Sequence, residues 1–289
     1  MLKHVTEARR GAASPPATPN GSVAEIMGVL NVTPDSFSDG GEWFSQDDAV
    51  RHGLEMLGAG ASIIDVGGES TRPGAAPVPE EEELARTVPV IAALSRAARG
   101  ATVSIDTTKL VVAEQAIAAG AGYVNDVSAF RLSPELADLV AQSGARCCLM
   151  HMQGEPRTMQ DNPTYGDVVD DVKAYLSERA EFALSRGIAH DLIDVDPGIG
   201  FGKTVEHNLE LLRRLDEIAA LGFRVLVGVS RKSFIGKLSG ADSPAERVAG
   251  SLAANVLAYE RGARVFRVHD VAEHRQALAV AGAVVGGES

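Results

Sequence analysis

Polar and ionisable residues follow the apolar runs of this chain, each at the point where a buried strand would pass into a loop. Eight runs end in this way, at Asn31, Asp65, Asp106, Asn125 with Asp126, His151, Asp196, Ser230 with Arg231 and Lys232, and Arg267 with His269. In a (β/α)8 barrel the carboxyl ends of all strands lie at one face, so these endings would meet in one polar cavity. Such a cavity would hold carboxylates, amides and cations, which can bind a polar or anionic ligand.

Two of these endings have the composition of an anion site. The segment SRKS at 230–233 places two cations where the amino terminus of a following helix would expose N–H donors. Arg267 and His269 alternate along the last strand and therefore share a face. The segment DPGIGFGK at 196–203 adds an acid before a glycine-rich turn, which alone is weak evidence for a ligand. Helix capping by Asp196 and a structural role for His269 are the alternatives, and the shared placement favours a diphosphate site.

The apolar runs and the segments between them alternate as strands and helices. Short runs rich in valine and isoleucine predict strands at 24–31, 61–66, 101–106, 121–127, 145–151, 192–196, 224–230 and 263–269. Apolar residues at three- and four-residue intervals predict helices, among them 47–60, 79–98, 110–121 and 206–222. Strict alternation predicts a parallel sheet, and eight units favour a closed (β/α)8 TIM barrel over an open doubly wound sheet.

Length and composition agree with one α/β domain, which we expect over residues 23–289, with two domains as the alternative. Residues 1–22 are rich in proline, serine and alanine and lack an apolar core, so we expect a disordered extension rather than a secretory signal. The connections 33–45, 67–81 and 152–167 are long for βα turns, which favours binding loops over simple insertions.

The charge balance and the cysteines narrow the function class. The chain has 39 acidic and 27 basic residues and a net charge of -12, which argues against a general nucleic-acid or anionic-membrane binder. No stretch approaches the ~20 apolar residues that span a bilayer.

Cys147 and Cys148 are neighbours in an apolar run and would point to opposite faces of a strand, so core packing in a reducing cytoplasm is favoured over a disulfide or metal site. The acidic run at 80–83 indicates the start of a helix.

Eight separated motifs also carry a resemblance to a known family. They are MGVLNVTPDSFSDGG, DVGGESTRPGA, SIDTTK, VNDVS, LMHMQG, DPGIGFGK, VGVSRKS and RVHDV. In this order they resemble the signatures of bacterial dihydropteroate synthase. This family condenses 6-hydroxymethyl-7,8-dihydropterin diphosphate with 4-aminobenzoate, releasing diphosphate and forming 7,8-dihydropteroate for folate synthesis; it uses Mg²⁺ and usually forms homodimers. Leu110 departs from the family, which often has proline there, and this concerns the start of a helix more than the chemistry.

The resemblance implies a pterin site. Its residues would be Asp106, Asn125, Met150, Asp196, Phe201, Lys232 and Arg267, with Lys232, Asp106, Asp196 and Arg267 as the catalytic set. Asp196, Asp106 and Asn125 would hydrogen-bond the amino and N–H edge of the ring, and Lys232 would donate to its oxygen and nitrogen. Met150 and Phe201 would line the ring faces, on which the Arg267 guanidinium can stack.

The resemblance likewise implies sites for the other ligands. Diphosphate would be bound by Asn31, Thr71, Arg72, Arg267 and His269, and 4-aminobenzoate by Phe37, Thr71, Pro73 and Ser233. Asn31 resembles the family's magnesium ligand and Asp39 is a second candidate; Mg²⁺ retains waters, so few protein ligands suffice. Ser233 and the helix that follows would meet the carboxylate of 4-aminobenzoate. The resemblance also implies sensitivity to sulfonamides, which resemble this substrate but extend beyond its carboxylate.

These roles suggest a dissociative substitution, in which the dihydropterin delocalises positive charge developing at its exocyclic methylene while Mg²⁺ and the cations stabilise the departing diphosphate. We see no covalent nucleophile, because Ser230 and Ser233 lack an evident paired base. Three other functions compete with this reading: a pterin-binding methyltransferase domain for a corrinoid partner, an inactive pterin-binding barrel, and a Schiff-base aldolase using Lys232. The STRPGA and SRKS segments, and the lack of a second cofactor domain in this sequence, favour the synthase.

Overall fold

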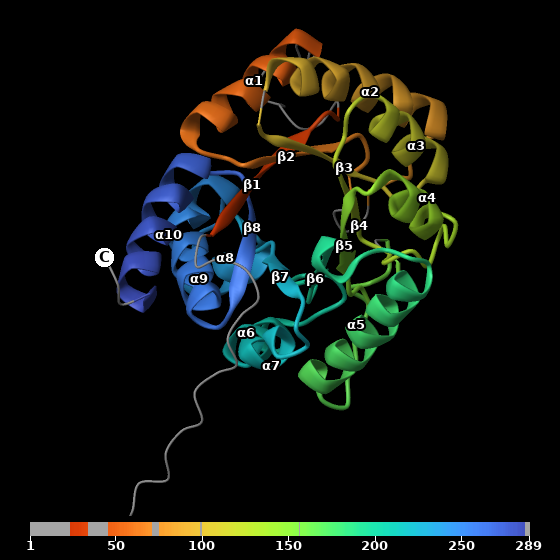
Figure 1. Ribbon diagram of the computed structural model, residues 1–289. Coiled ribbons are helices and arrows are strands. Elements are labelled where there is room, and N and C mark those ends of the chain that lie inside the picture. Colours follow the sequence, from red (N-terminus) through yellow and green to blue (C-terminus); the bar gives the residue numbers. More distant parts are fainter. Residues whose placement is uncertain (1–23, 34–45, 71–74, 99, 156, 287–289) are drawn as a thin grey trace, which may run out of the picture.

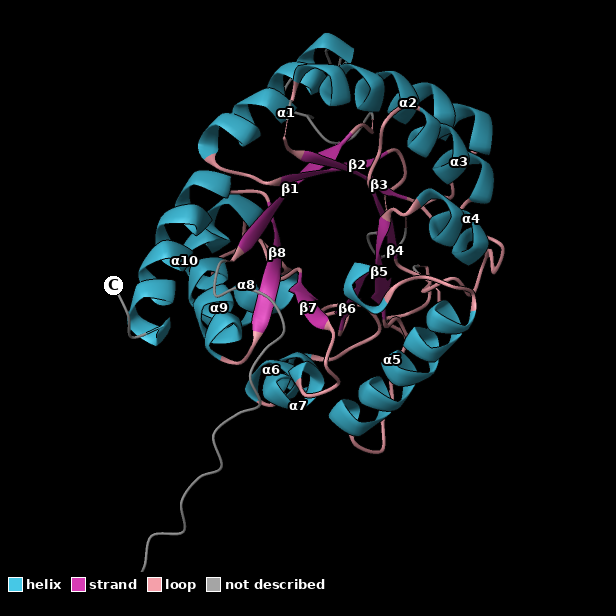
Figure 2. Ribbon diagram, in the orientation of Figure 1, coloured by secondary structure: helices cyan, strands magenta, loops and turns pink. Residues whose placement is uncertain are grey.

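The computed structural model describes residues 24–33, 46–70, 75–98, 100–155 and 157–286. Eight parallel strands close into a barrel in sequence order, and the helices surround it (Figure 1, Figure 2). The strands are β1 (Glu25–Asn31), β2 (Ile63–Gly67), β3 (Thr102–Asp106), β4 (Tyr123–Asp126), β5 (Arg146–Met150), β6 (Ile193–Asp196), β7 (Arg224–Val227) and β8 (Ala263–Val268). This architecture confirms the predicted (β/α)8 barrel. The expected amino-terminal extension lies outside the described residues.

The helices follow the strands in turn. They are α1 (Gln46–Ala59), α2 (Glu80–Ala97), α3 (Leu110–Ala118), α4 (Leu136–Ser143), α5 (Val168–Ser185), α6 (Val205–Arg213), α7 (Leu215–Ala219), α8 (Ser233–Ser239), α9 (Val248–Glu260) and α10 (Val271–Gly286), with short 3-10 turns η2 (His190–Leu192) and η3 (Pro244–Arg247). The helix expected over 206–222 is interrupted at Arg214, whose φ of -111° and ψ of 29° are not helical. Its guanidinium binds Asp167 and Glu217, and a one-residue break leaves the apolar periodicity of the sequence almost unchanged.

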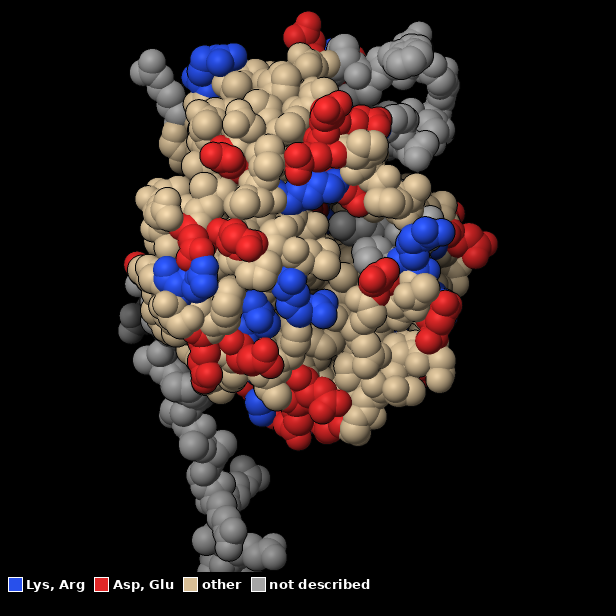
Figure 3. Space-filling model, turned by 90° about the vertical axis from the view of Figure 1, so that its right-hand side faces the viewer, with Lys and Arg blue, Asp and Glu red and all other residues tan. Residues whose placement is uncertain are grey.

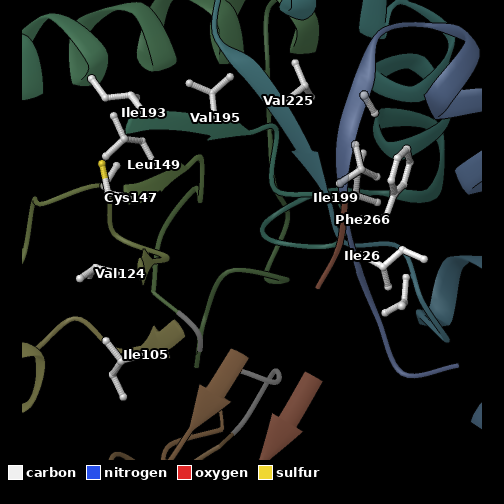
Figure 4. Close-up of a cluster of buried hydrophobic side chains, with 14 of the residues drawn as sticks. Ile26, Ile105, Val124, Cys147, Leu149, Ile193, Val195, Ile199, Val225 and Phe266 are labelled. Carbon is white, nitrogen blue, oxygen red and sulfur yellow. The ribbon is translucent and has the colours of Figure 1, made fainter. Parts of the chain in front are cut away.

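Alternation along the strands divides the core into two parts. Outward-facing residues such as Ile105, Val124, Leu149 and Val195 pack against the helices in one large cluster, part of which Figure 4 shows. Inward-facing residues form a smaller separate cluster of Met27, Ile63, Tyr123, Cys148, Leu226 and Val265. Cys147 belongs to the outer cluster and Cys148 to the inner one, and both are buried free thiols, as the sequence predicted.

A charged cluster closes the amino-terminal end of the barrel interior. Arg146 and Arg224 each bind Glu25 and Asp194, at 2.9 to 3.3 Å. Tyr123 donates its hydroxyl to Asp194 at 2.7 Å, and burial raises the pKa of Asp194 to about 7. The inward-facing apolar cluster separates this charged cluster from the carboxyl ends of the strands.

The outer surface of the described chain carries both signs of charge. On the face drawn in Figure 3, basic side chains are interspersed with acidic ones. Among the described helices, none is long and apolar enough to cross a bilayer.

Candidate functional site

Four strands bring a hydrogen-bonded group of polar side chains together inside the carboxyl-terminal half of the barrel. Asp65 of β2, Asp106 of β3, Asn125 of β4 and Arg267 of β8 all point inward. The Arg267 guanidinium donates to Asp65 at 2.6 Å and to Asp106 at 2.8 Å, while the Asn125 amide donates to Asp65 at 2.9 Å. The structure therefore collects three of the residues assigned to the pterin site, Asp106, Asn125 and Arg267, into one network.

Asp65 is the centre of this network; the sequence placed it among the converging strand ends but assigned it no role in ligand binding. Its side chain is fully buried and accepts from Asn125, Arg267 and the Ser104 hydroxyl, the last at 2.6 Å. It fixes the orientation of two predicted ligand-binding groups rather than facing the substrate itself. A carboxylate between apolar residues in the run SIIDVGG was the available signal, since a buried charge needs partners.

The environment of Asp106 perturbs its titration. Burial, together with the negative charge of Asp65, raises the pKa of Asp106 to about 7, against the opposing effect of Arg267. Near neutral pH this carboxyl can thus be present in both forms. A group in that state can either accept or donate a hydrogen bond at the edge of a heteroaromatic ring.

Asp196 lies at the end of β6, across the barrel from this network. Its carboxylate accepts the Gly198 N–H at 2.7 Å, and burial raises its pKa while Lys232 opposes the rise. Lys232 donates its ammonium to the Ile199 carbonyl and lies 4.6 Å from the centre of the Phe201 ring. Burial and nearby Arg267 lower the pKa of Lys232 to about 8, although Asp196 opposes this shift. The acid and the base predicted to meet the pterin edge therefore share one side of the cavity.

An apolar lining borders the two polar groups. Val127, Met150, Met152 and Met159 form a cluster separate from the main core, and Phe201 packs against it. It joins the ends of β4 and β5 to the turn after β6. Met150 and Phe201 were predicted to cover the faces of a flat ring, and the structure places them in contact with the same cluster.

The turn at 196–203 is held by a second lysine that the prediction left without a role. Lys203 is 3 % exposed, and its Nζ lies 2.9 Å from His151 Nδ1 and donates to the Phe201 carbonyl at 3.0 Å. Burial lowers the pKa of His151 to about 3 and lowers that of Lys203. Glycine is required at 198, where φ is +66° and a Cβ would lie 1.8 Å from the His151 oxygen. The turn is thereby fixed against β5, with Phe201 facing the cavity lining.

The segment 230–233 differs from the expected pair of cations. Arg231 forms an ion pair with Asp270 instead of facing the cavity beside Lys232. Ser230 accepts the His269 N–H at 3.1 Å, and its hydroxyl also lies 3.2 Å from the His269 ring nitrogen. Ser233 is exposed at the first position of α8, which has only seven residues. His269 and Ser233 lie near the carboxyl ends of β8 and β7. Because Arg231 is paired with Asp270, this segment offers one cation, Lys232, where the sequence suggested two.

Asn31 ends β1 at the rim of the network. A Cβ at neighbouring Gly67 would lie 3.6 Å from both Asn31 Oδ1 and Asp106 Cβ, so glycine leaves the space between these side chains open. No hydrogen bond joins the Asn31 side chain to another described residue. The other rim residues of the prediction, namely Phe37, Asp39, Thr71, Arg72 and Pro73, lie outside the described residues.

Comparisons with known proteins agree with this geometry. The family model described as pterin binding enzyme matches residues 27–269. A dihydropteroate synthase from Synechocystis is 48% identical over 259 residues, which cover 90% of this chain and 89% of the relative. The crystal structure of Yersinia pestis dihydropteroate synthase with a sulfonamide drug complex superimposes with a TM-score of 0.87 at 42% identity, covering 94% of this chain and 98% of that one. The Xanthomonas albilineans enzyme with 4-aminobenzoic acid superimposes with a TM-score of 0.85 at 48% identity, covering 91% of this chain and 93% of that one.

The match to the family model spans the chain from β1 to the end of β8, and nearly half of the residues aligned with the Synechocystis enzyme are identical. The chain belongs to the dihydropteroate synthase family of pterin-binding enzymes.

Proposed function

We propose that this chain condenses 6-hydroxymethyl-7,8-dihydropterin diphosphate with 4-aminobenzoate, giving 7,8-dihydropteroate and diphosphate for folate synthesis. The observation that carries the proposal is the placement of Asp196 and Lys232 beside the apolar lining, opposite the network of Asp106 and Asn125. A flat heteroaromatic ring with N–H donors for Asp196 and an oxygen or nitrogen acceptor for Lys232 suits this set of side chains.

In this proposal the pterin ring binds with its amino group and ring N–H toward Asp196. Ionised Asp196 accepts these hydrogens, and Lys232 donates to the ring oxygen and nitrogen. Asp106 and Asn125 meet the remaining edge, with Asn125 oriented by its bond to Asp65. Met150 and Phe201 exclude water from the ring faces, which strengthens each of these hydrogen bonds.

The diphosphate of the substrate binds near the carboxyl end of β8, where Arg267 is in the strand and His269 follows it. Arg267 is held by two carboxylates, so its position is fixed before any ligand binds. Thr71 and Arg72 would bind the diphosphate as well. The space beside Asn31, whose side chain forms no hydrogen bond with another described residue, fits a Mg²⁺ ion that would take its other ligands from water, diphosphate and Asp39. Mg²⁺ bound there would neutralise charge on the diphosphate oxygens.

The reaction breaks the bond between the exocyclic methylene carbon and the diphosphate oxygen and forms a bond from that carbon to the aniline nitrogen. The bonding electrons leave with the diphosphate, and the aniline nitrogen then releases one proton to solvent. Arg267 and His269 stabilise the leaving group, while Asp106 and Asp196 face the ring where positive charge develops. A dissociative course suits a weak aniline nucleophile. Lys232 stays bound to the ring and forms no covalent bond.

The second substrate binds last at the rim. Phe37, Thr71 and Pro73 would contact its ring, and the Ser233 hydroxyl would donate to its carboxylate. Because α8 is short, we assign this contact to the hydroxyl rather than to a helix dipole. The related Xanthomonas structure contains 4-aminobenzoic acid and the Yersinia structure a sulfonamide, which supports both the substrate and sulfonamide sensitivity of this chain.

We also propose a cytoplasmic homodimer. Exposed apolar side chains gather on the outer faces of two adjacent helices, with Leu257 of α9 at 49%, and Val280 and Val284 of α10 at 66% and 77%. A second copy of the chain would cover them. The two buried free thiols agree with a reducing compartment.

The test is an assay of the purified chain with the pterin diphosphate and 4-aminobenzoate. We expect Mg²⁺-dependent release of diphosphate with one dihydropteroate formed per diphosphate, and loss of both products after chelation with EDTA. Pterin binding without turnover would favour an inactive pterin-binding barrel. Methyl transfer from a methylated pterin to a corrinoid protein would favour the methyltransferase alternative.

A further inference from the structure

A group of charged side chains outside the pterin network joins three elements at the same rim of the barrel. The Lys109 ammonium donates to Glu69, just after β2, and to Glu83 of α2, each at 2.5 Å. It also donates to the Val78 carbonyl at 2.7 Å, just before α2. All three donor hydrogens of this ammonium are therefore used. Burial acts to lower the pKa of Lys109, but Glu69 and Glu83 raise it above its usual value. We call Lys109, Glu69 and Glu83 the Lys109 cluster.

Burial separates this cluster from an ordinary surface ion pair. Glu83 is 1 % exposed. It belongs to the acidic run at 80–83, which the sequence analysis attributed only to the start of helix α2. Glu69 and Lys109 are 28% and 24% exposed. A buried carboxylate costs stability unless it is paired, and removing its partner is strongly unfavourable. Exposed pairs elsewhere on the molecule carry no such cost, so the burial of Glu83 makes the position of Lys109 well defined.

The chain after β2 is tightly held beside the cluster. A Cβ at Gly68 would lie 2.8 Å from Thr87 Cγ2 and 2.9 Å from Glu83 Cγ, so glycine permits close contact with α2. Arg86 of α2 donates to the Gly68 carbonyl at 2.7 Å. These contacts fix the point at which the chain leaves β2.

Lys109 binds the chain on both sides of residues 70–77, since Glu69 precedes this stretch and Val78 follows it. Lys109 is also three residues after Asp106, and the intervening Thr107 N–H donates to the Asn125 carbonyl at 3.1 Å. The cluster therefore connects the entry and exit of the β2–α2 connection to the strand ends that form the pterin site. A shift of Lys109 would move Glu69 and Val78 relative to the strand ends of the pterin site.

We propose that Lys109 is a positioning residue for the second substrate and the leaving group, acting through Glu69 and Val78 and not through contact with either substrate. The inference rests on the proposed function, which assigns Thr71, Arg72 and Pro73 of this connection to those two ligands. Pterin recognition, which uses side chains inside the barrel, does not depend on the cluster.

The first measurement compares Glu69→Gln and Lys109→Met with the wild-type chain. At saturating pterin diphosphate we expect the KM for 4-aminobenzoate and the inhibition constant of a sulfonamide to rise about 10- to 100-fold, because small displacements of binding groups have effects of this order. The Kd of a pterin analogue, measured by calorimetry, should stay within about twofold. Lys109→Arg, which keeps the charge and several donors, should recover part of the loss.

Glu69→Gln leaves the buried Glu83–Lys109 pair intact and so avoids an unpaired buried charge. If Lys109→Met does not fold, the double variant Lys109→Met with Glu83→Gln removes that charge and should show the same change in KM. Lys173→Met is the matched control, because it breaks a partly exposed 3.0 Å pair between α5 and Glu217 and should change neither constant.

The outcomes separate the two proposals. Equal losses for the pterin analogue and 4-aminobenzoate, or an unchanged KM in folded Glu69→Gln, would show that the cluster is only a structural ion pair. A wild-type chain that makes no dihydropteroate would overturn the proposed function itself, whatever the variants do.

Discussion

Replacing Asp65 by asparagine tests whether the pterin site is held in place before the substrate arrives. Asp65 contacts no ligand in the proposed function, but it accepts hydrogen bonds from Ser104, Asn125 and Arg267. Asparagine has nearly the same shape and keeps one oxygen. The substitution therefore removes the charge and one acceptor without leaving a cavity.

The magnitude follows from the three hydrogen bonds. The remaining oxygen can still accept from Asn125 and Arg267, and Ser104 can reverse its hydroxyl to accept from the new amide. A hydrogen bond to a charged group contributes about 1 kcal/mol more than a neutral one, so two weakened bonds cost about 2 kcal/mol of stability. Arg267 keeps Asp106 as a partner, which prevents the larger penalty of an unpaired buried charge.

Catalysis should suffer separately from stability. With Asp65 neutral, Asn125 and Arg267 lose part of their fixed orientation, and we expect kcat/KM for the pterin diphosphate to fall about 10- to 100-fold, or about 1.4 to 2.7 kcal/mol. The pKa of Asp106 should also fall below about 7, because the negative charge of Asp65 helps to raise it.

The assay combines urea unfolding, followed by circular dichroism, with calorimetric titration of a pterin analogue and steady-state kinetics. Asp194→Asn is the control, since Asp194 is an equally buried carboxylate with two arginine partners at the opposite end of the barrel. It should alter stability while leaving pterin affinity unchanged. Wild-type pterin affinity and kcat/KM in folded Asp65→Asn would refute the idea that Asp65 orients the site.

Four further predictions address the ligands. Asp196→Asn should raise the Kd for the pterin by an amount worth about 1 to 3 kcal/mol, because an acceptor becomes a donor facing a donor edge; near-normal affinity by calorimetry would refute this contact. Pterin affinity should fall as pH rises through about 8, where Lys232 loses its proton, and should also fall on acidification, because the raised pKa of Asp196 lets it become protonated. Lys232→Arg should remove the decline at alkaline pH; if the decline persists in this variant, it comes from another group. Binding should be ordered, so 4-aminobenzoate should give no calorimetric signal until pterin diphosphate and Mg²⁺ are present, and tight binding to the free chain would contradict this. Pro73→Ser should raise the sulfonamide inhibition constant more than the KM for 4-aminobenzoate, since the drug extends further; equal changes would disprove selective loss, and an uninhibited wild type would disprove sensitivity.

Most of the architecture could be predicted from the sequence, because its signals are local. Short runs rich in valine and isoleucine, separated by segments of helical periodicity, predicted all eight strands to within a few residues. The same runs end in Asp106, Asn125, Asp196, Lys232 and Arg267, and parallel strands necessarily bring their carboxyl ends to one face. The sequence therefore placed these residues at one end of the barrel before the fold was known. Their roles stay predictions, as do those of Phe37, Asp39, Thr71, Arg72 and Pro73.

The partners of those residues were decided only by the closed barrel. Arg267 meets Asp65 across 202 residues of sequence, because β8 returns to β1 and lies near β2 when the sheet closes. Packing between neighbouring βα units pairs Arg231 with Asp270 and buries Glu83 against Lys109. Apolar periodicity specifies which face of a strand or helix is buried, but a charged side chain is oriented by the partner that balances it. That partner comes from a distant segment of the chain, so only the tertiary structure determines which charges bind substrate and which bind each other.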